Sequence, residues 1–232
     1  MIDLKDPEYL YLVKQGSDEW HHKRMGIVTA SQINALITAK GKPAKNQAMR
    51  SYACQIASQR EYSFLEDNYQ SFDMMRGHYC EQIARDIYND SFDEVFECGI
   101  ITRQINGFVL GASPDGLVGK DGGIEIKSRV PKFQFETINA GEVPDEYMNQ
   151  VQACLLVSGR DWWDYVQYSN GLPLFVRRVK PDEERQALIV NALDEFEVEV
   201  QRVHAEFKEK SAGLVQTKRI EIKFEDDVIV AS

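Results

Sequence analysis

The sequence predicts a mixed α/β (α+β) fold in which helices flank a central mixed β-sheet, within a single domain spanning residues 1–232. Segments with helical periodicity alternate with short, glycine-bounded segments rich in Val, Ile and Phe, as helices and strands do. No repeat, low-complexity tract or Pro/Gly-rich linker divides the chain. Hydrophobic residues make up 43% of the chain, which is enough for one buried core.

Turn and cap signals set the expected order of the elements. Thr29 or Ser31 can cap an early helix, which the sequence Lys40–Pro43 then ends because it contains Gly and Pro. The expected helices cover residues 29–39, a stretch that ends at 60, 73–89, 145–157 and 182–210. The expected strands cover residues 94–103, 107–112, 123–129, 162–168, 174–180 and 219–224.

Composition also limits the environment of the protein. No apolar run reaches the roughly 18 residues needed to cross a bilayer, so no membrane association is expected. The N-terminal sequence contains acidic residues where a secretory signal would be basic and then apolar. The four cysteines are far apart, which predicts reduced thiols in a cytoplasmic protein.

Charge is unevenly distributed along the chain. The net charge of −10 would by itself argue against a polyanionic partner, because affinity for nucleic acid comes largely from neutralised phosphates. Residues 20–60, however, contain seven Lys and Arg and no Asp or Glu. Residues 181–232 contain 13 acidic and seven basic residues, so this region is not expected to contact phosphate. The basic region is either a solvated surface or a phosphate contact.

Three charged residues form the pattern with the clearest chemistry. Asp115 lies in a turn, and Glu125 and Lys127 follow on one face of the next predicted strand, with Ile126 turned into the core. Neighbouring carboxylates repel each other unless a hard cation such as Mg²⁺ lies between them. A nearby lysine can orient the attacking water or stabilise charge on phosphorus. The pattern predicts metal-dependent phosphodiester hydrolysis; the alternative is an ordinary ion pair on a surface strand.

The surrounding motifs strengthen the hydrolytic interpretation. Their order resembles the PD-(D/E)xK nuclease superfamily, and within it the lambda-type phage exonucleases (alkaline exonucleases of the viral recombinase family). The resemblance covers roughly residues 15 to 170. The matching motifs are Gly16–His21, Arg24–Ser31, Gly77–Glu81, Ser113–Leu117, Glu125–Lys127 and Gln150–Gln152.

The resemblance implies specific roles for these residues. It implies a restriction-endonuclease-like fold in which Asp115, Glu125 and the backbone carbonyl of Ile126 bind Mg²⁺. It makes Lys127 the catalytic lysine and Glu81 the support of a second metal ion, with Mn²⁺ able to substitute for Mg²⁺. The residues implied to contact the 5′-phosphate or the DNA are Arg24, Ser31, Ser113, Gln150, Trp20, Lys40 and Lys42. Trp20 could equally be a core residue, and the lysines of the 40–45 loop cannot be ranked.

The resemblance further implies a Mg²⁺-dependent 5′→3′ exonuclease that degrades one strand of linear duplex DNA to mononucleotides and leaves a 3′ overhang. A ring-shaped homotrimer, a single-strand annealing partner and a phage or prophage origin in a bacterial cytoplasm follow from it. The chain would comprise a basic helical region (20–60), a catalytic core (73–170) and a C-terminal long helix and tail (181–232). The alternatives are a structure- or sequence-specific endonuclease of the same superfamily and a non-catalytic DNA-end-binding protein.

Overall fold

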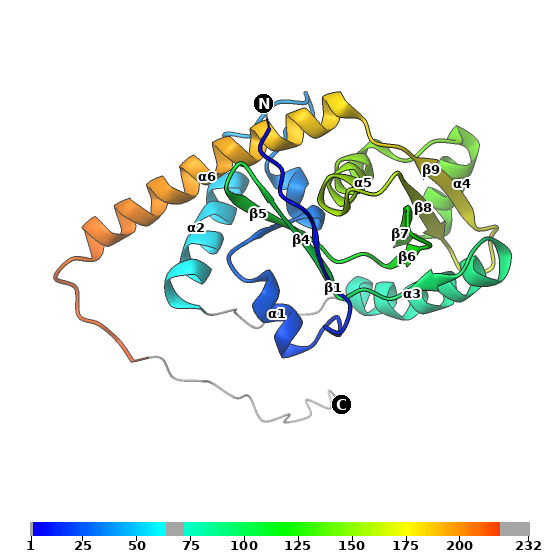
Figure 1. The fold of residues 1–232 in the computed structure, drawn as a ribbon, viewed down its shortest axis with the longest axis horizontal. Coiled ribbons are helices and arrows are strands. Elements are labelled where there is room, and N and C mark those ends of the chain that lie inside the picture. The colour runs from blue at the N-terminus through cyan, green and yellow to red at the C-terminus, as the bar shows by residue number, and fades with distance from the viewer. Residues whose placement is uncertain (1, 64–71, 219–232) are drawn as a thin grey trace, which may run out of the picture.

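A computed structural model describes residues 2–63 and 72–218 and shows two mixed β-sheets with helices around them (Figure 1). The first sheet has the strand order β1-β4-β5-β2 and the second the order β3-β6-β7-β8-β9. The strands of the first sheet are β1 (Glu8–Leu10), β4 (Ile100–Ile105), β5 (Phe108–Ala112) and β2 (Val28–Thr29). Those of the second are β3 (Val95–Phe96), β6 (Gly116–Val118), β7 (Gly122–Ser128), β8 (Trp162–Tyr168) and β9 (Phe175–Val179).

Each sheet contains one parallel pair of strands. In the first sheet β2 runs parallel to β5, and in the second β7 runs parallel to β8, with Glu125 opposite Tyr165. The remaining pairs are antiparallel. The turn 113–115 leads the chain from β5 of one sheet directly into β6 of the other. The predicted mixed α/β class is confirmed, but the strands form two sheets and not the single central sheet that was expected. The chain passes between the sheets from β3 into β4 and again from β5 through this turn into β6.

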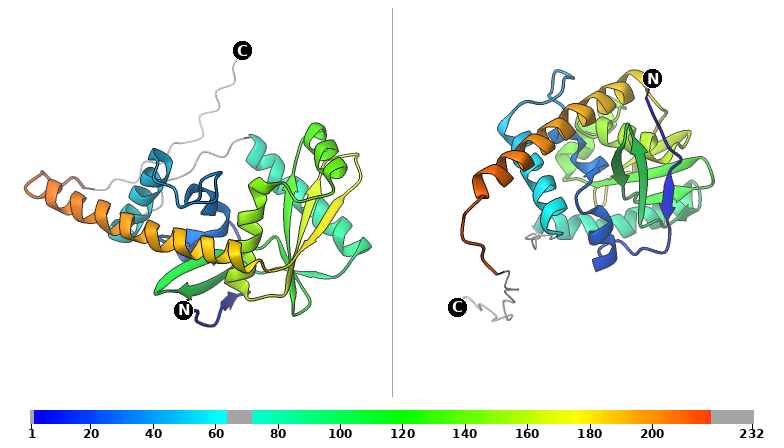
Figure 2. Two further views of the ribbon diagram at one scale, coloured as in Figure 1. Left: turned by 90° about the horizontal axis from the view of Figure 1, so that it is seen from above. Right: turned by 60° about the vertical axis from the view of Figure 1, so that its left-hand side comes forward.

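Helices cover both faces of the five-stranded sheet. Helix α3 (Phe72–Ser91) packs Ala84 and Tyr88 against Ile124 and Ile126 of β7 on one face. Helices α4 (Pro131–Ala140) and α5 (Asp145–Ser158) lie on the opposite face, and Figure 2 shows α5 between the two sheets. The side chains of Glu125 and Lys127 point toward α5, because they alternate with the isoleucines of β7.

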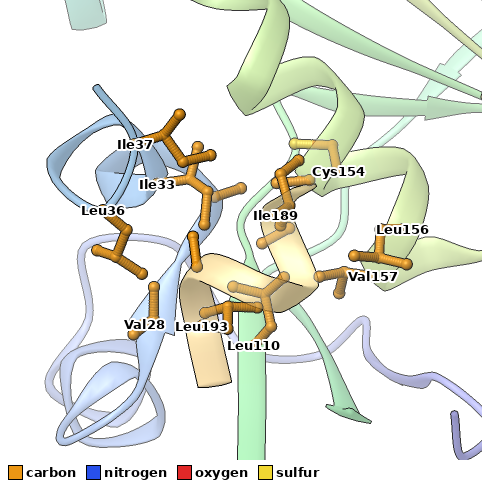
Figure 3. Close-up of a cluster of buried hydrophobic side chains, with 14 of the residues drawn as sticks. Val28, Ile33, Leu36, Ile37, Leu110, Cys154, Leu156, Val157, Ile189 and Leu193 are labelled. Atoms are coloured by element: carbon orange, nitrogen blue, oxygen red, sulfur yellow. The ribbon is translucent and has the colours of Figure 1, made fainter. Parts of the chain in front are cut away.

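The main core lies where α5 meets the N-terminal elements and the C-terminal helix (Figure 3). Helix α5 supplies Cys154 and Val157, β5 supplies Leu110, and α6 (Glu183–Ser211) supplies Ile189 and Leu193. The other helical elements are α1 (Asp18–Arg24), the 3₁₀ helix η1 (Ala30–Ala35) and α2 (Gln47–Tyr62). No helix in the described ranges is long and apolar enough to cross a membrane.

Most predicted elements are present, and the differences have local causes. The strand at 162–168 matches β8, and Asp182 caps α6 by accepting a hydrogen bond from the Arg185 amide. The predicted helix over 29–39 is a short 3₁₀ helix, because Thr29 makes no side-chain cap and the chain turns at residues 39–42. Helix α3 begins one residue before Asp73, and α4 was not predicted at all. The predicted strand at 219–224 lies outside the described residues.

Candidate active site

The turn that joins the two sheets brings Asp115 next to strand β7. The Oδ2 atom of Asp115 accepts a hydrogen bond from the backbone N–H of Ile126 at 2.5 Å. On the neighbouring positions of β7, the Lys127 ammonium lies 2.7 Å from Oε1 of Glu125. We call Asp115, Glu125 and Lys127 the acid–lysine cluster. The structure therefore brings together the three residues that the sequence pattern singled out.

The carboxylates of Asp115 and Glu125 repel each other, and a bound cation would reduce this repulsion. Burial, followed by the charges of Glu125 and Glu81, raises the pKa of Asp115 well above its usual value. Burial opposes the charge on Lys127, but Glu125 and Asp115 outweigh it and raise the pKa of the lysine. The lysine is therefore protonated at neutral pH, and one positive charge faces two acids.

The two carboxylate oxygens of Glu125 have different surroundings. Its Oε1 accepts hydrogen bonds from both Lys127 and Gln150 of α5, the latter at 2.5 Å. Its Oε2 is buried and has no hydrogen-bond partner among the described residues. A buried carboxylate oxygen without a donor is costly unless a cation compensates it. Asp115 and Glu125 carry hard oxygen donors of the kind that Mg²⁺ prefers, and the binding of a metal ion by these residues and the Ile126 carbonyl stays a prediction.

Glu81 lies on α3, and its charge contributes to the raised pKa of Asp115. Its carboxylate forms an ion pair with Arg85 at 2.5 Å, one turn further along the helix. Arg85 also contacts Glu97 at 3.0 Å. Among the side chains that the structure describes, which exclude those of residues 72–75 and 78, no three from His, Cys, Asp or Glu are grouped closely enough to hold a metal ion. The role of Glu81 at a second metal ion stays a prediction.

A second group of residues lies on the other side of the 113–115 turn, and we call Trp20, Arg24 and Ser113 the anion pocket. Ser17 caps α1 by accepting a hydrogen bond from the Trp20 amide, which sets the start of the helix. Both the Arg24 guanidinium (2.9 Å) and the Trp20 indole N–H (2.8 Å) donate to the Ser113 hydroxyl. The guanidinium also stacks over the Trp20 ring at 4.2 Å. Trp20 is thus neither a core residue nor fully exposed.

The guanidinium of Arg24 is partly buried and donates a hydrogen bond to a hydroxyl group. Burial lowers the pKa of its guanidinium. No carboxylate in the described part of the chain pairs with it; its contacts are with Ser113 and Trp20, and its charge interacts with Tyr52. A partly buried guanidinium whose donors face a hydroxyl is suited to bind an anion such as phosphate.

Four other residues that were predicted to contact the 5′-phosphate or the DNA are not part of the anion pocket. Ser31 is exposed at the start of η1, 3.3 Å from the Thr29 hydroxyl. Gln150 donates a hydrogen bond to Glu125 and so lies beside the acid–lysine cluster. Lys40 and Lys42 are exposed in the loop before α2, and neither forms an ion pair among the described residues. Their contacts with DNA stay predictions.

Two supporting residues were missed by the sequence reasoning. The Gln15 side-chain amide donates to the carbonyls of Cys98 (3.0 Å) and Pro114 (2.8 Å), and thereby holds the turn that carries Asp115. The Tyr147 ring lies 5.4 Å from the Lys127 ammonium. Gln15 directly precedes the Gly16–His21 motif, which was the available signal, whereas nothing in sequence spacing links Tyr147 to β7.

Comparison with known proteins identifies the family. The YqaJ-like viral recombinase domain matches residues 19–161, which is more than half of the chain and includes both groups of residues. The chain belongs to this family. The predicted resemblance to the lambda-type phage exonucleases is thus confirmed, and the protein is a nuclease of the viral recombinase type.

Solved structures agree with this assignment. An alkaline exonuclease (LHK-Exo) from Laribacter hongkongensis is 33% identical, with a TM-score of 0.73 over 86% of this chain and all of that chain. The same enzyme in complex with dAMP matches at 32% identity and the same TM-score. A phage related exonuclease from Haemophilus somnus 129PT shares the fold at 13% identity, with a TM-score of 0.57 over 78% of this chain and 96% of that chain. No curated protein matches the sequence.

Proposed function

We propose that this nuclease is a Mg²⁺-dependent 5′→3′ exonuclease on linear duplex DNA, which releases mononucleotides and leaves a 3′ single-stranded overhang. One observation carries the proposal: the turn 113–115 contributes Ser113 to the anion pocket and Asp115 to the acid–lysine cluster. An enzyme that binds a terminal 5′-phosphate in the pocket would present the next phosphodiester to the cluster. An endonuclease has no need of a terminal pocket.

The two groups of residues would have separate roles, one in binding the end of the DNA and the other in hydrolysis. Arg24, Ser113 and Trp20 hold the 5′-terminal phosphate and the first base. Lys127 places its ammonium beside the phosphate under attack and stabilises the negative charge that develops there. Gln150 and Lys127 fix the orientation of Glu125. Mg²⁺ bound by Asp115, Glu125 and the Ile126 carbonyl would polarise the phosphate and lower the pKa of a bound water.

The wider assembly is part of the same proposal. A ring-shaped homotrimer would let duplex enter and only the uncut strand leave, so that processivity follows from topology. The acidic exterior, with a net charge of −10, would discourage DNA from binding elsewhere on the surface. Mn²⁺ would substitute for Mg²⁺, Glu81 would support a second ion, and a single-strand annealing protein would receive the overhang in the bacterial cytoplasm.

The test compares three substrates in Mg²⁺ and in chelator: linear duplex with 5′-phosphate ends, linear duplex with 5′-hydroxyl ends, and closed-circular duplex. We expect metal-dependent release of mononucleotides from the linear substrates only, faster from phosphorylated ends. Nicking of the circle would replace the proposal with an endonuclease. Binding without cleavage in Mg²⁺ or Mn²⁺ would replace it with an end-binding protein.

A further inference from the structure

The backbone of Gly26 is held on both sides by helix α2. The Gly26 N–H donates to Oε1 of Gln59 at 2.9 Å, and Nε of Arg60 donates to the Gly26 carbonyl at 2.8 Å. Gly26 has φ of +70°, and a Cβ atom there would lie 2.8 Å from Cγ of Arg60. This residue must therefore be glycine both for its backbone conformation and for the close approach of Arg60.

Gly26 occupies the link between two parts of the site. Helix α1 ends at Arg24, and β2 begins at Val28 and leads into η1, which carries Ser31. The direction in which the chain leaves α1 depends on the dihedral angles of this short link. A change in the Gly26 peptide would therefore move the Arg24 guanidinium relative to Ser113, which lies in the 113–115 turn between the two sheets.

We call the contacts of Gln59 and Arg60 with the Gly26 backbone the clamp, and it extends to Glu197 on the C-terminal helix. Nη1 of Arg60 forms an ion pair with Oε1 of Glu197 on α6 at 2.6 Å. The Glu197 side chain is 9% exposed and that of Arg60 is 37% exposed, so the pair is shielded mainly on the α6 side. Helices α2 and α6 lie side by side (Figure 1). Because Glu197 holds one edge of the guanidinium, the Nε–H on the other edge is directed at the Gly26 carbonyl.

We propose that Gln59, Arg60 and Glu197 are positioning residues that fix the Gly26 peptide and thereby the geometry of the anion pocket for a terminal 5′-phosphate. This inference rests on the proposed exonuclease function and deepens it. It assigns a role to α6, which lies beyond the residues 19–161 matched by the family. None of the three residues needs to touch DNA.

The test uses two variants of the clamp and one conservative replacement. Gln59→Leu removes the acceptor for the Gly26 N–H, Gln59→Glu keeps an acceptor of the same length, and Glu197→Gln removes the ion pair with Arg60. The control for Glu197→Gln is Glu199→Gln, because Glu199 is on the same helix and also pairs with α2, through Arg50 at 3.7 Å. The control for Gln59→Leu is Gln134→Leu, since Gln134 is buried and bonds backbone carbonyls far from the pocket.

The readout is the ratio of the Kd values for 5′-hydroxyl and 5′-phosphoryl duplex, measured in chelator so that nothing is cleaved. Gln59→Leu should lower this ratio by about tenfold, the lower end of what outer hydrogen-bond partners contribute at metal sites, and Glu197→Gln should lower it less, because Glu197 acts on Gly26 only through Arg60. In Mg²⁺ the same variants should raise KM for phosphorylated ends more than they lower kcat. Gln59→Glu, Glu199→Gln and Gln134→Leu should keep the wild-type ratio.

The outcomes separate this inference from the function on which it rests. If Gln59→Leu and Glu197→Gln lose thermal stability but keep the wild-type ratio, the clamp only joins helices and the inference is overturned. If Gln59→Leu does not fold, the comparison of the Kd ratio of Glu197→Gln with that of Glu199→Gln decides the inference, and equal ratios overturn it. Arg24→Ala tests the pocket itself: an unchanged ratio in that variant would overturn the proposed phosphate site, whatever the clamp variants do.

Discussion

The orphaned oxygen of Glu125 and the repulsion between Glu125 and Asp115 predict that Mg²⁺ stabilises the folded protein. A ligand that binds only the native state at 100 times its Kd adds about 2.7 kcal/mol to the free energy of unfolding. For 232 residues the entropy of unfolding is about 0.5 kcal/mol/K near the melting temperature. We therefore expect Mg²⁺ at that concentration to raise Tm by about 5 °C.

The stabilisation should depend on pH with a defined sign. Burial and the charges of Glu125 and Glu81 raise the pKa of Asp115, so the metal-free folded protein binds a proton there that the unfolded chain has lost. Its free energy of unfolding therefore falls as pH rises from about 4, the unfolded pKa of Asp, through the folded pKa. Mg²⁺ takes the place of that proton, so its effect on Tm should be larger at pH 8.5 than at pH 6.

The assay is calorimetric unfolding at both pH values, with Mg²⁺ or with chelator, for the wild type and Asp115→Asn. The variant removes one of the two repelling charges and keeps an oxygen that can accept from the Ile126 N–H. It should be at least as stable as the metal-free wild type at pH 8.5 and gain less than about 1 °C from Mg²⁺. An equal gain in the variant, or a larger wild-type gain at pH 6, would refute the assignment of the metal site to these carboxylates.

Three further predictions concern single residues. Lys127→Met should abolish hydrolysis while the protein remains folded, because Lys127 supplies the ammonium that pairs with Glu125 in the described part of the chain; full activity in a mononucleotide-release assay would remove the lysine from the mechanism. Arg24→Ala should erase the preference for phosphorylated ends in competition between 5′-phosphate and 5′-hydroxyl duplex, and a wild-type preference would misplace the pocket. Asp164→Ala should lower the free energy of unfolding by about 2–3 kcal/mol, or Tm by roughly 4–6 °C, because it breaks a buried carboxylate's bonds to Tyr88 (2.7 Å) and Arg178 (2.9 Å); an unchanged denaturation midpoint would contradict this.

The acid–lysine cluster could be predicted from the sequence because its geometry is local. Glu125 and Lys127 are two residues apart on a strand, so they must lie on the same face of it. Asp115 directly precedes β6, and β6 pairs with β7, so Asp115 lies beside the strand that carries the other two residues. The strand at 162–168 could also be predicted, because its apolar and aromatic residues are typical of a strand that is buried on both sides of the sheet. Helix α4 was missed because its exposed Phe133 and Phe135 obscure the amphipathic pattern.

The sequence by itself determined the mixed α/β class, the family and the charged residues of β7, because each of these depends on residue type and on spacing within one or two elements. Only the tertiary structure decided that Arg24 meets Ser113, 89 residues away, and that Gly26 lies between Gln59 and Arg60. It also decided that Glu197 reaches this site from the C-terminal helix. Such contacts depend on how two sheets and α2 and α6 pack together, and no local periodicity of the chain encodes that packing.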